Sequence, residues 1–185
     1  MFCLPQSVGT ACSGTDSPVI ALAALTEALL HMGFPSAPTI HEFSCEADAA
    51  KRGWIRRVCC PLHLFDDIRN LGQNFARDVV HGDGLGFQSR VPEVFLFIAG
   101  FSCKSVSGLN LCRGMYQNAC AIEVGETGIT FGGVRKYLSA KKPCMFVLEN
   151  VVGLNKQLPA VESERGGLSI KCTIVNWQRN NLYSL

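Results

Sequence analysis

Two polar side chains each follow a strongly apolar run, at the point where a buried strand is expected to end. Cys103 stands in the loop AGFSCKSVS after the run 94–99, and Glu149 directly follows the run 144–148. A carboxylate after a buried strand is costly unless it is exposed or partnered. We therefore expect Cys103 and Glu149 to face one crevice from neighbouring strands, where a thiol beside an acid is a nucleophile with a proton partner. A buried structural thiol would leave the small, polar surroundings of Cys103 unexplained.

A small-residue loop follows the first expected strand and leads into a helix. Bare backbone in such a loop can approach a nucleotide-like ligand closely, although an ordinary tight turn has the same composition. The residues of this loop are Cys12, Ser13, Gly14 and Thr15.

At the ends of two further strands, side chains are placed where they could contact the same ligand. Glu46 follows the second strand, where a carboxylate can accept hydrogen bonds from a ribose diol. Asp67 follows the third, where it could meet an adenine amino group while Ile68 packs on the ring. The alternatives, a solvated acid at a helix start or a helix cap, stay open for each residue taken singly.

Strands and helices alternate along the chain, which indicates an α/β fold with a mostly parallel sheet. In such sheets ligands bind at the carboxyl ends of the strands. Strands are expected at 7–12, Thr39–Cys45, His63–Phe65, 94–99, 144–148 and 169–175, and helices at 17–33, 47–58 and 133–142. The first helix is expected to have Ser17 as its N-cap and Pro18 at its first position. Lys51, Arg52, Arg56 and Arg57 are expected on the exposed side of the second helix.

Composition indicates a globular chain of about one domain. Of 185 residues, 48% are hydrophobic and 17% charged, and the net charge of +2 is too small for a nucleic-acid footprint by itself. No apolar run reaches the roughly 18 residues of a membrane span, so no membrane partner is expected. The first residues, MFCLPQSVGT, lack the features of a signal peptide, and cysteines lie in apolar runs, so an intracellular, reducing compartment is expected. No metal is expected, because Cys59, Cys60 and His63 have no second pair at zinc spacing.

Ordered in this way, the segments resemble the motifs of the cytosine-5 methyltransferase family, which uses S-adenosylmethionine. The matching segments are ACSGTDSP, FSCEADAAKRGWI, LFDDIRNLG, GFSCKSVSGLN and MFVLENVVGL, and FGGVRKYLSAKKP resembles the helix before the last of them. The similarity runs from about residue 7 to 154. It implies a Rossmann-like S-adenosylmethionine-dependent methyltransferase fold.

The resemblance also implies roles for single residues. Cys103 would add to carbon 6 of a cytosine turned out of its helix, and Glu149 would hold ring nitrogen 3. Carbon 5 would then take the methyl group of S-adenosylmethionine, and loss of its proton would expel Cys103. Asn150 would order the nearby backbone, with Ser107 in a further supporting role. The cofactor would be bound by Cys12, Ser13, Gly14, Thr15, Glu46, Asp67, Ile68 and Gly100.

The chain departs from the family pattern at three places. The family usually has proline before the nucleophile, where Ser102 stands here, and Lys104-Ser105-Val106-Ser107 replaces the usual residues after it. A glycine of the first family motif falls at Asp16, which would put a carboxylate near the methionine end of the cofactor. The arginine-containing motif, the target-recognition region and the final motif of the family are not found.

These departures lead us to expect that residues 1–185 form a single, incomplete catalytic domain that stops before its last strand and is inactive or incomplete alone. It would be a fragment, a truncated product or one half that assembles with a complementing C-terminal half. The substrate is expected to be cytosine in DNA, with nuclear location if the source is eukaryotic. Two alternatives stay open: a transfer-RNA methyltransferase of the same family, and a non-catalytic remnant that binds S-adenosylmethionine or a partner protein.

Overall fold

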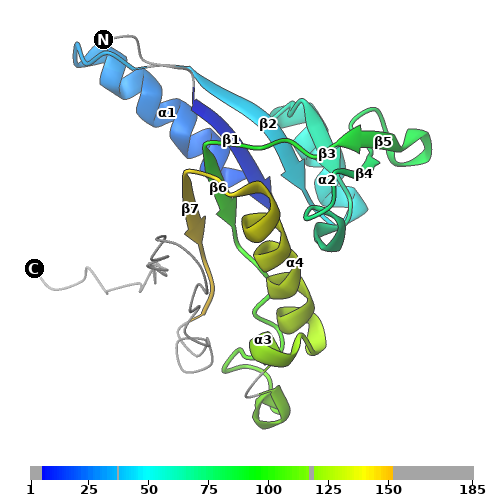
Figure 1. Cartoon of the computed structure of the whole chain (residues 1–185). Helices are drawn as coiled ribbons and strands as arrows, with labels where there is room; N and C mark the ends of the chain where they lie inside the picture. The colour runs from blue at the N-terminus through cyan, green and yellow to red at the C-terminus, as the bar shows by residue number, and fades with distance from the viewer. Residues whose placement is uncertain (1–5, 37, 117–118, 152–185) are drawn as a thin grey trace, which may run out of the picture.

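The computed structural model describes residues 6–36, 38–116 and 119–151. Its elements form one α/β unit, drawn in Figure 1. The symbol η denotes a short 3-10 helix. In chain order the elements are β1 (Gln6–Ala11), α1 (Ser17–His31), β2 (Thr39–Cys45), α2 (Ala49–Val58), β3 (His63–Phe65), η1 (Ile68–Asn70), β4 (Phe75–Asp78), η2 (Asp83–Leu85), β5 (Phe87–Arg90), β6 (Leu96–Ala99), η3 (Arg113–Tyr116), α3 (Ala119–Ile122), α4 (Gly125–Lys141) and β7 (Met145–Leu148).

The strands form a seven-stranded mixed sheet in the order β5-β4-β3-β2-β1-β6-β7. Strands β3, β2, β1, β6 and β7 are parallel to one another. At the β3 edge, β4 pairs antiparallel with β3, and β5 pairs antiparallel with β4. The expectation of an α/β fold with a mostly parallel sheet is confirmed. The strand order is compatible with a Rossmann-like arrangement. The strand expected at 169–175 lies outside the described residues.

The register of the parallel strands aligns their carboxyl ends. Ala11 of β1 is opposite both Cys45 of β2 and Ala99 of β6, and Ala99 is opposite Leu148 of β7. The residues that come next are therefore in one row, which consists of Cys12, Glu46, Gly100 and Glu149. In Figure 1 the arrows of β1, β2, β6 and β7 point to the same end of the molecule, where α4 begins.

Aromatic side chains fill the space between the sheet and α4. The ring of Tyr137 stacks on Phe97 at 4.4 Å and meets the edge of Phe43 at 5.5 Å, and its hydroxyl donates to the carbonyl of Pro92. Phe43 fits over β1 because Gly9 has no side chain: a Cβ there would lie 2.3 Å from the Phe43 ring. This packing anchors α4 along the sheet.

Helix α4 begins eight residues earlier than the sequence predicts, at Gly125 rather than 133. Glycine disfavours helix in a local analysis, but here it allows close contact. A Cβ on Gly128 would lie 2.1 Å from the Ala119 carbonyl oxygen, and one on Gly133 would lie 2.8 Å from that of Ile68. The extra turns bring Glu126 and Thr130 to the carboxyl ends of the strands.

Three other local features differ from the sequence-based expectation. The N-cap of α1 is Asp16, not Ser17, and it adopts the left-handed conformation at φ 58°. The hairpin β4–β5 was not expected, because its short strands carry more polar than apolar residues. Arg52 is buried rather than exposed: its guanidinium donates to the carbonyls of Glu46 and Ala47 and to the Asp83 carboxylate.

Candidate active site

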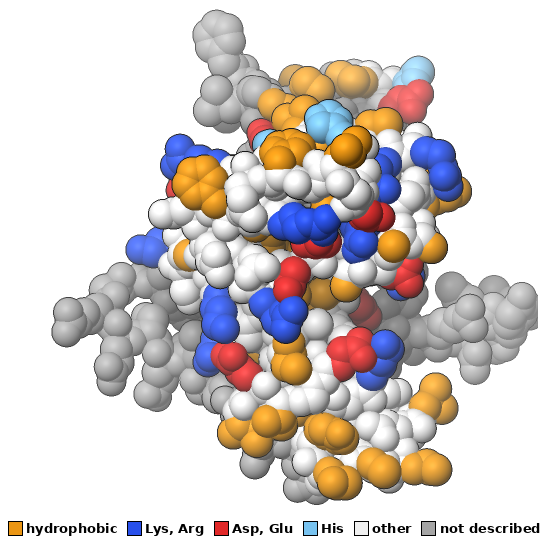
Figure 2. Space-filling view, turned by 90° about the vertical axis from the view of Figure 1, so that its right-hand side faces the viewer, with side chains coloured by type: hydrophobic (Ala, Val, Ile, Leu, Met, Phe, Trp, Pro, Cys, Tyr) orange, Lys and Arg blue, Asp and Glu red, His pale blue; other side chains and the backbone are white. Residues whose placement is uncertain are grey.

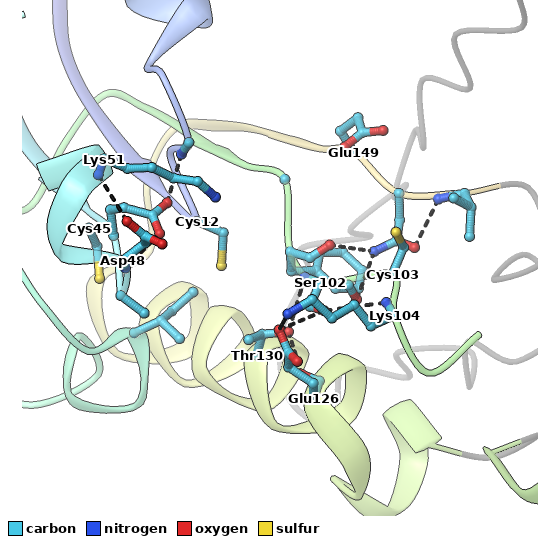
Figure 3. Close-up of a pocket in the computed structure, with 18 residues that line it drawn as sticks. Cys12, Cys45, Asp48, Lys51, Ser102, Cys103, Lys104, Glu126, Thr130 and Glu149 are labelled. Carbon is cyan, nitrogen blue, oxygen red and sulfur yellow. Dashed lines mark hydrogen bonds and ion pairs between the residues drawn. The ribbon is translucent and has the colours of Figure 1, made fainter. Parts of the chain in front are cut away.

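A cavity of about 440 Å³ opens at the carboxyl ends of β1, β2, β6 and β7. Of the residues that the sequence singles out, it is lined by Cys12, Gly14, Glu46, Ile68, Gly100, Cys103, Glu149 and Asn150. Figure 3 shows Cys12 between two groups of side chains, with Cys45, Asp48 and Lys51 on one side and Ser102, Cys103 and Glu126 on the other. The aligned strand ends therefore bring the two halves of the expected site together.

Glu46 fixes the backbone around the part of the cavity at the carboxyl ends of β1 and β2. One of its carboxylate oxygens accepts the Gly14 N–H at 2.8 Å and the other accepts the Asp48 N–H at 2.9 Å. Gly14 has φ +59°, and nothing lies within 4 Å of the position where its Cβ would be, so its backbone is bare toward the cavity. This half of the cavity offers a fixed carboxylate, bare backbone and the apolar side chain of Ile68.

The two cysteines in this half are held as neutral thiols. Burial raises the pKa of Cys12 to about 12, and the carboxylates of Glu46 and Glu126 add to the effect. Burial likewise raises the pKa of Cys45 far above its usual range. Both side chains therefore act as small apolar groups, because the thiolate is the reactive form of cysteine.

The loop that carries Cys103 forms a helical turn whose contacts fix its backbone. The N–H groups of Val106 and Ser107 donate to the Cys103 carbonyl at 3.0 and 2.8 Å. Ser105 exchanges hydrogen bonds with Thr127 of α4, through the N–H and hydroxyl of each residue. The thiol of Cys103 is half-buried at the cavity wall.

Strand β7 supports the same loop from the other side. The Glu149 N–H donates to the Ala99 carbonyl at 2.9 Å, and a Cβ added to Gly100 would lie 3.3 Å from Oε2 of Glu149. The Glu149 carboxylate thus lies against the bare backbone at the end of β6. Cys103 and Glu149 line one cavity from the paired strands β6 and β7.

Four predicted site residues do not line the cavity. Ser13 bonds to Thr10 and to the backbone of Cys45, and the Thr15 hydroxyl pairs with Ser17. The Asp67 carboxylate is paired with the Arg69 guanidinium, whose hydrogen bonds lower the pKa of that carboxyl. Ser107 closes the turn after Cys103.

Asp16 is also away from the cavity, contrary to the expectation of a carboxylate near the cofactor. It is fully buried under the loop and accepts hydrogen bonds from the hydroxyls of Thr10 and Ser44, with His41 Nε2 at 3.5 Å. The carboxylate turns inward because two buried hydroxyls need an acceptor.

Several cavity residues were missed by sequence reasoning. Lys51 lines the cavity because α2 begins directly after its N-cap, Asp48. Glu126 and Thr130 line it because α4 begins earlier than expected. The spacing of Glu126 and Thr130, four residues apart on one helix face, was the signal that could have found them.

The Cys59, Cys60 and His63 side chains have other partners. His63 Nδ1 is 2.6 Å from the Asp78 carboxylate, and the Cys60 thiol points to the Arg56 carbonyl. Among the described residues there is no group of three or more side chains that could hold a metal ion.

The surface beside the nucleophile loop exposes large apolar side chains. Leu109, Leu111 and Met115 are at least four-fifths exposed. In Figure 2 apolar side chains gather at the lower end of the molecule, where α3 is labelled in Figure 1. Within the described part of the chain, no helix is long and apolar enough to cross a membrane.

The sequence is similar to two curated fungal proteins, both named DNA (cytosine-5-)-methyltransferase DMT5. The protein of Cryptococcus neoformans var. grubii is 35% identical over 145 residues, and that of Verticillium dahliae is 28% identical over 188 residues. Each match covers 78% of this chain. The chain belongs to the cytosine-5 DNA methyltransferase family.

The chain matches only a small part of the length of each relative. The chain spans 6% of the Cryptococcus protein and 8% of the Verticillium protein. No family model matches the sequence. What the much longer relatives do as whole proteins therefore enters only as a proposal for this chain.

Proposed function

We propose that this chain forms the S-adenosylmethionine-binding and nucleophile-bearing part of a Rossmann-like enzyme that methylates carbon 5 of cytosine in DNA. The observation that carries the proposal is the shared cavity of Cys103 and Glu149 at the ends of the paired strands β6 and β7. The names of the two fungal relatives support DNA rather than transfer RNA as the substrate. A DNA substrate in a eukaryote would give the protein a nuclear location.

The cavity residues fit S-adenosylmethionine. The cavity volume of about 440 Å³ is within the range of pockets for small ligands and cofactors. The bare Gly14 backbone and the Glu46 carboxylate would hold the methionine end and the ribose, and Ile68 would pack on the adenine. The cavity is lined by four carboxylates, Glu46, Asp48, Glu126 and Glu149, against two lysines, which suits a ligand that carries a sulfonium charge. When bound, this cofactor supplies the methyl group.

The protein side of the reaction would use two groups. The Cys103 thiolate adds to carbon 6 of an extruded cytosine while Glu149 holds ring nitrogen 3, so that electron density develops at carbon 5. After methylation, carbon 5 loses its proton and the bond between carbon 6 and Cys103 breaks, which returns the thiolate. Cysteine suits both steps, because it is a good nucleophile and a good leaving group.

The test is to trap the covalent step on oligonucleotides containing 5-fluorocytosine, in which carbon 5 has no proton to lose. The protein is incubated with S-adenosylmethionine and a duplex oligonucleotide, and the adduct is measured on denaturing gels and mapped by mass spectrometry. Cys103→Ser should abolish the adduct and Glu149→Gln should slow it. Cys112→Ser, which changes an exposed thiol a few residues away, is the matched control.

Each outcome of this experiment decides between the candidate functions. An adduct at Cys103 on DNA supports the proposal, and an adduct on transfer RNA alone would replace it with the RNA alternative. Binding of S-adenosylmethionine without an adduct on either nucleic acid, for the chain alone and also after a complementing C-terminal half is added, would contradict the proposal and favour the non-catalytic alternative.

A further inference from the structure

Ser102 stands where the family usually has proline, and its polar groups are all used. Its N–H donates to the Thr130 hydroxyl at 3.2 Å, and its own hydroxyl donates to the Glu126 carboxylate at 3.2 Å. The same hydroxyl accepts the Lys104 N–H at 3.3 Å. Two of these contacts run from the nucleophile loop to α4.

Proline could make none of these three contacts. It has no N–H and no hydroxyl, and it restricts the backbone by fixing φ near −65°. A serine in the same place leaves the backbone free unless other groups restrain it. In this chain the restraint comes from the first turns of α4 rather than from the covalent geometry of the residue itself.

The Thr130 hydroxyl is set up to receive the Ser102 N–H. It donates to the Glu126 carbonyl at 2.8 Å, a bond back along its own helix, and this leaves an oxygen lone pair directed to the loop. A single helical turn therefore presents a fixed acceptor to Ser102.

The Glu126 carboxylate contacts the residues on both sides of the nucleophile. Besides the Ser102 hydroxyl, it pairs with the Lys104 ammonium at 2.9 Å, and this pairing raises the pKa of Lys104. The Lys104 pair is exposed and contributes little by itself. Together with Thr130, however, it restrains residues 102 and 104, so that Cys103 lies between two anchored neighbours, as Figure 3 shows.

We infer that Thr130 and Glu126 are positioning residues that hold Cys103 for attack, and that Ser102 with its contacts to α4 replaces the proline of the family. The inference rests on the proposed function, because it concerns the nucleophile of that reaction. It assigns to α4 a part in catalysis that neither residue type suggests alone.

A double-mutant cycle between Ser102 and Thr130 tests the inference. Thr130→Val removes the acceptor at nearly constant volume, and Ser102→Pro removes the donor and restores the family residue. The rate of adduct formation at saturating oligonucleotide is measured separately from the concentration that gives half the maximal rate. Thr26→Val is the matched control, because the Thr26 hydroxyl makes the same bond back along a helix, to Leu22 at 2.9 Å, on the distant α1.

We expect Thr130→Val to lower the saturated rate about fivefold, the factor that one ordinary hydrogen bond contributes, with little change in the half-maximal concentration. In the S102P background the same substitution should change the rate by less than about twofold, because no bond is left to lose. Thr130→Ser, which keeps the hydroxyl, should restore the rate. Equal losses in the two backgrounds, or a loss matched by Thr26→Val, would overturn the inference.

Amide hydrogen exchange separates this inference from the proposed function. Thr130→Val should speed exchange at the Ser102 N–H, and Thr130→Ser should not. If the unmodified protein formed no adduct either alone or with a complementing C-terminal half, the proposed function would fail, while the exchange data would still show whether α4 restrains the loop. Unchanged exchange at Ser102 in Thr130→Val would overturn the restraint itself.

Discussion

The side-chain amide of Asn150 donates to the backbone carbonyl of Phe101 over 2.7 Å and so joins the end of β7 to the loop that carries Cys103. The Asn150 carbonyl oxygen accepts the N–H of Val151, so both ends of the amide are used. Asn150 therefore orders the nucleophile loop and the chain after Glu149 at the same time.

Asn150→Ala should loosen this connection. It removes the amide group that donates a hydrogen bond to the buried Phe101 carbonyl. The free energy of unfolding, measured by urea titration, should therefore fall by about 1–3 kcal/mol. Adduct formation on Cys103 should slow by about tenfold, because the loop loses part of its preorganisation. Asn70→Ala is the control, since the Asn70 side chain accepts a hydrogen bond from an exposed glutamine; equal effects of the two substitutions would contradict the assignment.

Glu46→Ala should weaken S-adenosylmethionine binding, measured by calorimetry, by more than about tenfold. The substitution removes a carboxylate from the cavity and frees the N–H groups of Gly14 and Asp48 that it fixes. Glu46→Gln keeps the shape and one acceptor and should give an intermediate affinity. Glu27→Ala, on the exposed face of α1, should bind as the unmodified protein does. If Glu46→Ala also binds unchanged, the cofactor is not held at this strand end.

Gly100→Ala should disturb the placement of Glu149 with little cost in stability. The added methyl group would lie 3.3 Å from Oε2 of Glu149, so the carboxylate must shift by a few tenths of an ångström. Adduct formation should slow several-fold while the melting temperature stays nearly constant. Gly84→Ala provides the comparison, because a Cβ there meets nothing within 4 Å. A fully active Gly100→Ala protein would show that the position of this carboxylate is not critical.

Cys12 should make the stability of the protein fall at alkaline pH. The unfolded chain releases the thiol proton near the ordinary pKa of 9.0, and the folded protein releases it only near pH 12. Between these values the folded state binds more protons than the unfolded state, so the free energy of unfolding falls as pH rises.

Cys12→Ala removes this contribution, so its free energy of unfolding should fall less steeply than that of the unmodified protein between pH 9 and pH 12. Cys144→Ala, at an exposed thiol, should follow the unmodified protein. The free energy of unfolding is measured by urea titration at each pH. Parallel curves for the unmodified protein and Cys12→Ala would show that burial does not raise the pKa of this thiol.

The parts of the fold that sequence reasoning predicts are those with strong local signals. The strands β2 and β3 have the predicted bounds, and β1, β6 and β7 agree to within two residues. β6 and β7 are short apolar runs, which is typical of buried parallel strands. The row of residues at the strand ends follows from these strands. Glu149 was found because it directly follows an apolar run, and Glu46 because it follows the second expected strand. Cys12 was found in a loop of small residues, and Gly100 through the resemblance to the family.

The parts that it does not predict depend on tertiary contacts. The first turns of α4 are rich in glycine, and their helical state depends on the close approach to α3 and η1. Arg52 looks like a surface charge until the η2 segment brings Asp83 against it. Asp67 looks like a ligand group until the contact with Arg69, two residues away, occupies its carboxylate.

The inward-facing Asp16 has a consequence for protein engineering by consensus. The family residue at this position is glycine, which suits the backbone at φ 58° better than aspartate does. Replacing Asp16 with glycine would relieve the backbone and leave the hydroxyls of Thr10 and Ser44 without their acceptor. The backbone and the buried side chain thus have opposite requirements at one residue. A consensus version of this protein must therefore exchange positions 10, 16 and 44 together.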